Sequence, residues 1–354
     1  MIPQNEPLLG EEEIKELRKA INSQNLYEGA LTAEFEALLA KQHNVKFAVA
    51  CSNSTAAFYL AIKSADFYGD ILTSDLAFIG IASAISLAGA SPVFMDVDKL
   101  NFNILPEQIE DRATSRTGTA IIGHAFGQPS DMDRVMGIMK ARGYRLIEDC
   151  SGALGSSFAG RKVGSFGIAG VVGFWPGGII TTGEGAAVLT DDEGIADMVR
   201  ELKHHGRAAG QEFHREFGFN FVFTELQAAV GLAQLKRVDE IKRRKKEILK
   251  QYRQELGGIS SVVFPKDDTR CQYTPQFVNI LVDDSGAMKQ HLEKHSIATQ
   301  RFFQPMHREP EYEVEAYFEG ALYAYDHGLS LPSGAGLTED QVSFVCKNVK
   351  DFFK

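Results

Sequence analysis

The sequence predicts an α/β protein, in which a large, mostly parallel sheet domain flanked by helices is followed by a smaller C-terminal α+β domain. Two observations support this fold class. Short apolar runs alternate with helical patterns through the first two thirds of the chain, and this alternation stops after one long helical pattern. The length of 354 residues agrees with two domains, because one domain usually holds about 100–200 residues.

Six short apolar runs predict the strands of the large domain. In chain order they are Lys46–Cys51, Ser91–Asp96, Thr119–Phe126, Arg145–Asp149, Gly170–Trp175 and Ala186–Thr190. Helical patterns between them predict helices at Thr55–Lys63, Ser130–Arg142 and Asp192–Lys203. Strands that alternate with helices in this way form a parallel sheet with helices on both faces.

A long helix is predicted from Thr224 to about Leu256, where apolar residues recur at helical spacing. Because a helix of this length usually leaves one domain and enters another, we divide the chain into a large domain, residues 1–237, and a small domain, residues 238–354. The small domain is expected to contain strands at Ser260–Phe264, Gln276–Val282 and Thr299–Phe303 and helices at Ser285–His295 and Thr338–Phe353.

Charge and cysteine content exclude several classes of protein. The formal charge is -10, with a pI near 5.5. Acidic residues flank the basic run Lys242–Lys246 on both sides, so the run is interpreted as the solvated face of a helix. Nucleic acid is therefore not expected as a partner. The four cysteines form no CxxC pair, which argues against a zinc site or a disulfide framework and favours a reducing, cytoplasmic location.

One stretch has membrane-spanning length: Val163–Gly183 contains no charged residue over 21 positions. It also contains seven glycines and Pro176, and lipid does not tolerate such irregular backbone. A buried strand and loop is the better interpretation, and no membrane association is expected. The N-terminus has neither the basic nor the apolar region of a signal peptide.

Three segments are candidates for a functional site. Ser52–Ala57 joins a predicted strand to a predicted helix through small hydroxyl residues, so it favours either a phosphate site at a helix N-terminus or an ordinary helix cap. Ile147–Asp149 places two acids at the carboxyl end of a strand, where a carboxylate either pairs with a protonated ring nitrogen or caps a helix. The glycine-rich segment Gly173–Gly185 allows close approach of a ligand or forms a flexible loop.

These segments, together with others in the same order, resemble the DegT/DnrJ/EryC1/StrS family of pyridoxal-phosphate-dependent sugar aminotransferases, which have the aspartate aminotransferase fold (fold type I). The resemblance covers nearly the whole chain. Its motifs include Ser54-Thr55-Ala56-Ala57, His124-Ala125-Phe126-Gly127-Gln128-Pro129, Ile147-Glu148-Asp149, Thr182-Gly183-Glu184-Gly185, Gly218-Phe219-Asn220-Phe221 and Pro305-Met306-His307. It implies a role in the biosynthesis of nucleotide sugars for surface polysaccharides.

The resemblance also assigns roles to individual residues. Ser54 and Thr55 match the turn that holds the cofactor phosphate, and Phe78 matches the aromatic residue that stacks on the pyridine ring. Asp149 matches the acid that pairs with the pyridine nitrogen. Asn220 matches a residue that reaches the cofactor phosphate of the neighbouring subunit, which implies a homodimer. His124, His205 and His307 show no metal-ligand spacing and are expected to be structural, with His307 a candidate for lining the pocket.

Three positions depart from the family pattern. Gly178 stands where the family has its Schiff-base lysine, and no lysine lies between Lys162 and Lys203. Gly173 stands in place of a phosphate-binding serine, and Gly152 in place of a glutamine near the ring hydroxyl. A lysine replaced on purpose at position 178 would not explain why Gly173 and Gly152 also depart from the family pattern. Val222 also stands where arginine is frequent. Without the lysine, ordinary transamination is expected to be lost.

Three functional hypotheses follow. The chain is a family member in nucleotide-sugar biosynthesis without lysine-dependent catalysis, a non-catalytic subunit that pairs with a lysine-bearing paralogue, or a protein that binds a sugar nucleotide or a cofactor phosphate. In each case the expected cofactor is pyridoxal phosphate or pyridoxamine phosphate, held weakly and without a covalent bond. No metal site is expected.

Overall fold

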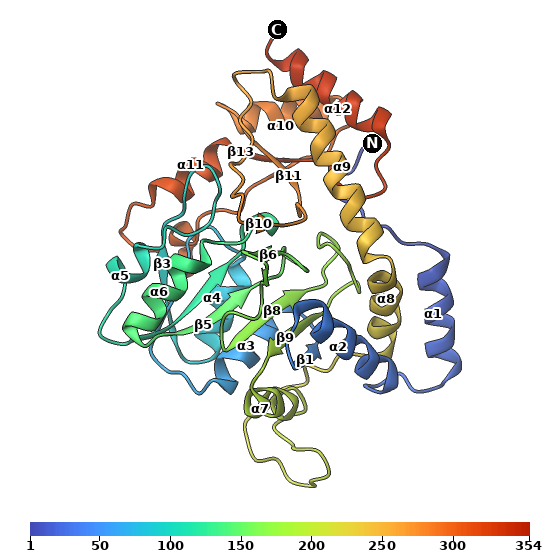
Figure 1. The fold of residues 1–354 in the computed structure, drawn as a ribbon, viewed down its shortest axis with the longest axis vertical. Coiled ribbons are helices and arrows are strands. Elements are labelled where there is room, and N and C mark those ends of the chain that lie inside the picture. The colour runs from blue at the N-terminus through green and yellow to red at the C-terminus, as the bar shows by residue number, and fades with distance from the viewer.

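The computed structural model describes residues 1–354 and is built around one seven-stranded sheet (Figure 1). Its strands run in the order β1-β9-β8-β5-β4-β2-β3, and β9 is the one strand antiparallel to its neighbours. The bounds are β1 Phe47–Cys51, β2 Asp70–Ser74, β3 Ser91–Met95, β4 Thr117–Gly123, β5 Arg145–Asp149, β8 Ala169–Gly173 and β9 Ala186–Thr190. The prediction of a mostly parallel sheet is therefore confirmed.

Helices cover both faces of this sheet (Figure 1). The side chains of β1 show why: Val49 and Cys51 enter the core cluster with α3 and α7, whereas Ala48 and Ala50 enter the cluster with α2 and α8. A strand buried on both faces is apolar throughout, as this one is. The helices up to residue 236 are α1 Glu11–Asn22, α2 Ala30–His43, α3 Ser54–Ser64, α4 Ile79–Leu87, α5 Gln108–Asp111, α6 Met132–Arg142, α7 Glu193–Lys203 and α8 Glu225–Lys236.

The C-terminal part has its own antiparallel sheet, in the order β11-β13-β12, and its own apolar core. Its elements are α9 Val238–Leu256, β11 Val278–Leu281, α10 Ser285–Lys294, β12 Gln300–Arg301, α11 Glu319–His327, β13 Gly328–Leu331 and α12 Glu339–Phe352. A third small sheet, β10 Cys271–Gln272 with β6 Ser157–Phe158 and β7 Arg161–Lys162, pairs residues from before and after α9. No helix is both long enough and apolar enough to span a membrane.

The single long helix predicted over Thr224–Leu256 is wrong. α8 ends at Lys236, and Arg237 has φ -105° and ψ 4°, which leaves the helical region before α9 begins at Val238. The two helices pack against different elements: α8 is buried against α1 and α2, whereas α9 packs on α12 in the C-terminal part (Figure 1). The change of direction at Arg237 allows both contacts, and helical periodicity alone did not indicate it.

Two further predictions differ from the structure. The strand predicted at Ser260–Phe264 is reduced to one isolated bridge between Val263 and Leu281. Strand β2, Asp70–Ser74, was not predicted, although all five of its residues are buried between β4 and β3. Polar residues at Asp70, Thr73 and Ser74 obscure its apolar character, and the neighbouring strands satisfy its backbone hydrogen bonds.

Candidate functional site

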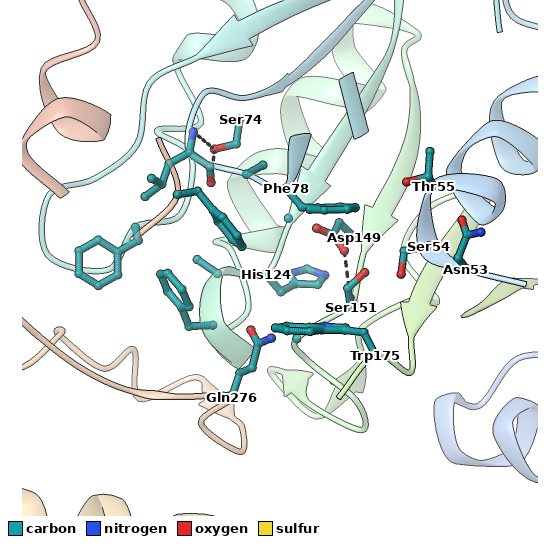
Figure 2. A pocket seen from close by; sticks show the side chains of 18 of the residues that line it. Asn53, Ser54, Thr55, Ser74, Phe78, His124, Asp149, Ser151, Trp175 and Gln276 are labelled. Carbon is teal, nitrogen blue, oxygen red and sulfur yellow. Dashed lines mark hydrogen bonds between the residues drawn. The ribbon is translucent and has the colours of Figure 1, made fainter. Parts of the chain in front are cut away.

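A cavity of about 740 Å³ lies at the carboxyl ends of the parallel strands. Much of its wall is made by residues at or just after the ends of β1, β2, β4, β5 and β8, which include Asn53–Ala56, Ser74, Leu76–Phe78, Gly123–Phe126, Asp149, Ser151, Gly152 and Trp175. Gln276 and Phe303 complete it from the C-terminal part. This is the edge at which open α/β sheets bind their ligands. Figure 2 shows the side chains around the cavity.

The N-terminus of α3 forms one end of the cavity. Asn53 caps this helix, because its Oδ1 accepts a hydrogen bond of 2.9 Å from the N–H of Ala56. The N–H groups of Ser54 and Thr55 donate to no atom of the chain, and both side chains line the cavity (Figure 2). Free backbone donors, two hydroxyls and the positive end of the helix dipole suit a phosphate group.

Asp149 ends β5 and faces the cavity. Its Oδ1 accepts a hydrogen bond of 2.9 Å from the N–H of Ser151, and burial raises the pKa of its carboxyl group although Ser151 and His124 oppose that shift. A partly desolvated carboxylate of this kind gains most from a cationic partner, because the ion pair offsets the cost of burial. The residue therefore suits a protonated ring nitrogen.

Phe78 presents its ring to the same space and is 42% exposed. The absence of a side chain at Gly80 makes room for it: a Cβ there would lie 2.2 Å from Phe78 Cε1 and 2.4 Å from Thr55 Oγ1. Trp175 lines the cavity too, and Figure 2 shows its indole on the side of Asp149 and Ser151 opposite the Phe78 ring. Two aromatic side chains thus flank the polar groups, an arrangement suited to a flat aromatic ligand.

The cavity contains no lysine, and Gly178 does not line it. The N–H of Gly178 donates to Trp175 O at 2.9 Å and closes a tight turn. A Cβ at Gly178 would lie 2.9 Å from Ile180 O and 3.2 Å from Trp175 O. Any side chain at this position therefore requires the backbone to move, because a carbonyl oxygen cannot rotate away as a side-chain end can.

Asn220 lies outside the cavity of its own chain. It is exposed, and its backbone forms an isolated bridge with His204. Its neighbour Phe221 does line the cavity, while Val222 is buried. The structure of the single chain thus brings Ser54, Thr55, Phe78 and Asp149 together and leaves Asn220 apart.

The sequence interpretation assigned no role in the cavity to His124, Ser151, Trp175 and Gln276, although it placed Trp175 in the candidate segment Gly173–Gly185 and expected His124 to be structural. The first three directly follow strand ends, and this position was the signal that could have identified them. The Ser151 side chain lines the cavity beside the Asp149 carboxyl group and acts to lower the pKa of that group. The expectation that His307 lines the cavity is wrong, because its Nδ1 pairs with Asp75 Oδ2 at 2.7 Å instead.

A buried cluster of His124, Glu148 and Cys150 has side-chain atoms close enough to share a metal ion. The Glu148 carboxylate, however, already accepts hydrogen bonds from the N–H groups of Gly164, Phe166 and Gly167 and pairs with His124 Nε2 at 3.2 Å. The other ring nitrogen of His124 accepts from Ser130 N–H at 3.2 Å. A metal ion would have to break these bonds, so the cluster is a structural hydrogen-bond network.

Comparison with known proteins places this geometry in a family. The model of the DegT/DnrJ/EryC1/StrS aminotransferase family matches residues 7–350. The chain belongs to the DegT/DnrJ/EryC1/StrS aminotransferase family. One member, the GDP-perosamine synthase of Escherichia coli O157:H7, is 31% identical over 99% of this chain and 98% of its own length. Another, the spore coat polysaccharide biosynthesis protein SpsC of Bacillus subtilis (strain 168), is 32% identical over 100% of this chain and 97% of its own.

Solved structures of similar proteins have the same fold. The aminotransferase TlmJ from Streptoalloteichus hindustanus superimposes with a TM-score of 0.96 at 28% identity, covering 100% of this chain and 99% of its own. DesI, solved in the presence of its TDP-sugar product, gives a TM-score of 0.92 at 27% identity, covering 99% and 92% of the two chains. The fold is therefore that of the pyridoxal-phosphate enzymes of fold type I.

The residues present fit the non-covalent part of a pyridoxal-phosphate site. Ser54 and Thr55 would hold the phosphate, Phe78 would cover the ring, and Asp149 would hold the ring nitrogen. Such a ring, when bound, supplies an electron sink for chemistry at an amino-bearing carbon. The Ser151 hydroxyl adds one more polar group beside the helix N-terminus. A Cβ built at Gly173 would lie 2.5 Å from Ser54 Oγ and 3.5 Å from Ser151 Oγ, so both hydroxyls lie close to the same point.

Proposed function

We propose that this protein acts in nucleotide-sugar metabolism as a family member that binds pyridoxamine phosphate, or pyridoxal phosphate, without a covalent bond and does not perform lysine-dependent transamination. One observation carries the proposal: the cavity brings Ser54, Thr55, Phe78 and Asp149 together but contains no lysine. The tight backbone around Gly178 supports it. The names of the polysaccharide and sugar-nucleotide relatives support the metabolic setting.

Within this proposal, the residues of the chain orient the ligand and provide no amine. Asp149 keeps the ring nitrogen protonated, because its buried carboxylate gains most when a cation lies beside it. Phe78 fixes the plane of the ring, and the helix N-terminus fixes the phosphate end. Because the covalent bond is lost, we expect a dissociation constant in the micromolar range or weaker. This corresponds to a binding free energy of about -8 kcal/mol at best.

Two measurements on the purified full-length chain test this function. After incubation with pyridoxal phosphate and reduction by borohydride, mass spectrometry should find no stoichiometric pyridoxyl label on any single lysine. Titration calorimetry with pyridoxamine phosphate should then show one saturable site per chain. A fully labelled lysine would contradict the loss of covalent binding. No heat and no saturation at millimolar pyridoxamine phosphate would contradict retention of the cofactor site.

A second candidate is a subunit that completes the site of a partner chain, either a second copy or a lysine-bearing paralogue. The position of Asn220 favours it, because this residue is exposed and lies outside its own cavity. Phe213 and Phe217, in the same segment, are 61% and 82% exposed, so they provide apolar surface near Asn220 that a partner chain could cover. The interface should then be of obligate size, roughly 2,000 Å² or more.

Light scattering tests the homodimer directly. We expect a mass twice that of the 38.9 kDa chain at micromolar concentration. A stable monomer that binds pyridoxamine phosphate with unchanged affinity on dilution would contradict a site completed from a second copy. A monomer that forms a 1:1 complex only when co-expressed with a lysine-bearing relative would favour the heterodimer.

A further inference from the structure

The amide of Gln276 occupies the space in which a side chain at position 152 would lie. A Cβ at Gly152 would be 2.3 Å from Gln276 Oε1, 2.9 Å from its Cδ and 3.6 Å from its Nε2. The two residues come from different parts of the chain: Gly152 follows β5, whereas Gln276 immediately precedes β11. An amide thus reaches this point of the cavity wall from the C-terminal part (Figure 2).

The backbone around Gln276 is held firmly on both sides. Its N–H donates to Phe126 O at 2.9 Å, and its carbonyl oxygen accepts from Lys245 Nζ at 2.9 Å. Gly127, with φ +103°, allows this close approach, since a Cβ there would lie 2.3 Å from Thr274 O. These contacts fix the backbone of Gln276 and therefore the point from which its side chain reaches the cavity wall.

The Gln276 amide itself has no hydrogen-bond partner. The residue is only 8% exposed, yet neither Oε1 nor Nε2 bonds to another atom of the chain, and both lie at the cavity wall. Both amide atoms keep contact with the space of the cavity, since neither is among the fully buried polar atoms of the chain. A ligand that displaces water from this wall loses affinity unless it replaces the hydrogen bonds of that water. The unpartnered amide thus points to a polar group on a ligand.

We propose that Gln276 is a ligand-binding residue that donates a hydrogen bond from its amide to a polar substituent on the edge of the bound aromatic ring. This inference rests on the proposed function and deepens it. For pyridoxamine phosphate the substituent is the ring hydroxyl, which is the oxygen on the ring next to the aminomethyl group. Gly152 and Gln276 then act as a pair, in which the missing side chain of one makes space for the amide of the other.

A cycle of two protein forms and two ligands tests this contact. Titration calorimetry compares wild type and Gln276→Leu with pyridoxamine phosphate and with 3-deoxypyridoxamine phosphate, which lacks the ring hydroxyl. We expect wild type to prefer pyridoxamine phosphate by about tenfold, the value of one buried hydrogen bond, and Gln276→Leu to lose this preference. Leucine has a similar volume, so ring stacking should persist and the deoxy analogue should bind both proteins equally.

The double variant Gly152→Gln/Gln276→Gly supplies the reciprocal control, because it returns an amide to the same space from the other residue. It should regain at least part of the preference for the hydroxylated ring. Unchanged far-ultraviolet circular dichroism and unfolding midpoint for Gln276→Leu would establish that the variant folds. Equal preference in wild type and Gln276→Leu would overturn the role of Gln276 and leave the proposed function standing. Failure of wild type to bind pyridoxamine phosphate at all would overturn both.

Discussion

At the residue scale, the proposed function depends on two residues, Asp149 at the cavity wall and Gly178 outside it. Asp149 keeps its position at the end of β5 and its partly desolvated carboxylate. Gly178 lies in a turn where a Cβ would be 2.9 Å from Ile180 O and 3.2 Å from Trp175 O. In the proposed function, ring binding depends on a cavity residue and the lack of a covalent bond on a position outside the cavity, so the two can be tested one residue at a time.

Replacing Asp149 should weaken the binding of pyridoxamine phosphate. For Asp149→Ala we expect at least a tenfold loss of affinity, because a charge-assisted hydrogen bond is worth about 1.5–3 kcal/mol. Titration calorimetry at neutral pH measures this directly. Asp149→Asn keeps the shape but cannot neutralise a pyridinium ion, so it should resemble the alanine variant. Unchanged affinity in both variants would show that the ring nitrogen does not face this carboxylate.

A side chain at position 178 should destabilise the fold. We expect Gly178→Ala to lower the free energy of unfolding by about 1–3 kcal/mol, because its Cβ would meet Ile180 O at 2.9 Å and force a backbone shift. Gly137→Ala is the matched control: Gly137 lies in α6 with no atom within 4 Å of the added Cβ, so this change should stabilise by about 0.5–1 kcal/mol. Urea unfolding compares the two, and equal effects would contradict crowding at Gly178.

At the scale of elements, the helix ends explain where the sequence interpretation succeeded. The predicted helices Asp192–Lys203 and Thr338–Phe353 begin at residues whose side chains cap the observed helices α7 and α12. The prediction of one helix over Thr224–Leu256 failed because the break at Arg237 carries no proline or glycine. A local cap is visible in sequence, whereas a change of direction imposed by packing is not.

The cap of α12 provides a test at this scale. Thr338 Oγ1 accepts from Gln341 N–H at 3.2 Å, and Gln341 Oε1 accepts from Thr338 N–H at 3.0 Å. Thr338→Ala should cost about 1 kcal/mol in the free energy of unfolding, because it leaves a helix donor without a partner. Thr338→Ser retains the hydroxyl and should stay within a few tenths of a kcal/mol of wild type. A stability equal to wild type for Thr338→Ala, measured by urea unfolding, would contradict the contribution of the cap.

At the scale of the whole molecule, a buried group that stays neutral in the folded chain but ionises in the unfolded chain makes the free energy of unfolding depend on pH. His43, at the end of α2, is fully buried, with Nδ1 bonded to Val163 O at 2.9 Å and Nε2 without a partner. Burial lowers the pKa of its imidazole to about 4, with the nearby Lys242 and Lys162 acting in the same direction. The folded chain therefore holds a neutral ring that the unfolded chain would protonate below its ordinary pKa of about 6.5.

The sign of the resulting effect follows from proton binding. Between pH 6.5 and 4 the unfolded state binds more protons at His43 than the folded state does, so the free energy of unfolding should fall as the pH falls. Over the whole window this contribution is about 3 kcal/mol. His43→Gln keeps a donor for Val163 O but cannot titrate, so its stability should depend less steeply on pH. Urea unfolding at pH 7, 6, 5 and 4.5 compares the slopes, and identical slopes would contradict a buried neutral His43.

The sequence by itself determined the fold class, the family and the identity of Ser54, Thr55, Phe78 and Asp149 as candidates. The fold class and the candidates Ser54, Thr55 and Asp149 depend on local patterns: strand–helix alternation, a hydroxyl turn at a helix start and acids at a strand end. The family and the candidate Phe78 follow from the resemblance of ordered motifs along the chain. The sequence also shows that no lysine lies between Lys162 and Lys203, and folding cannot add one to that segment.

The tertiary structure decided how the glycine positions are used. From the sequence, Gly152, Gly173 and Gly178 looked like three losses in one pocket. In the folded chain the space beside Gly152 holds the Gln276 amide, the space beside Gly173 holds the Ser54 hydroxyl, and the space beside Gly178 is closed by carbonyl oxygens. The physical reason is that a missing side chain leaves a volume, and only the packing of residues distant in sequence determines what enters it.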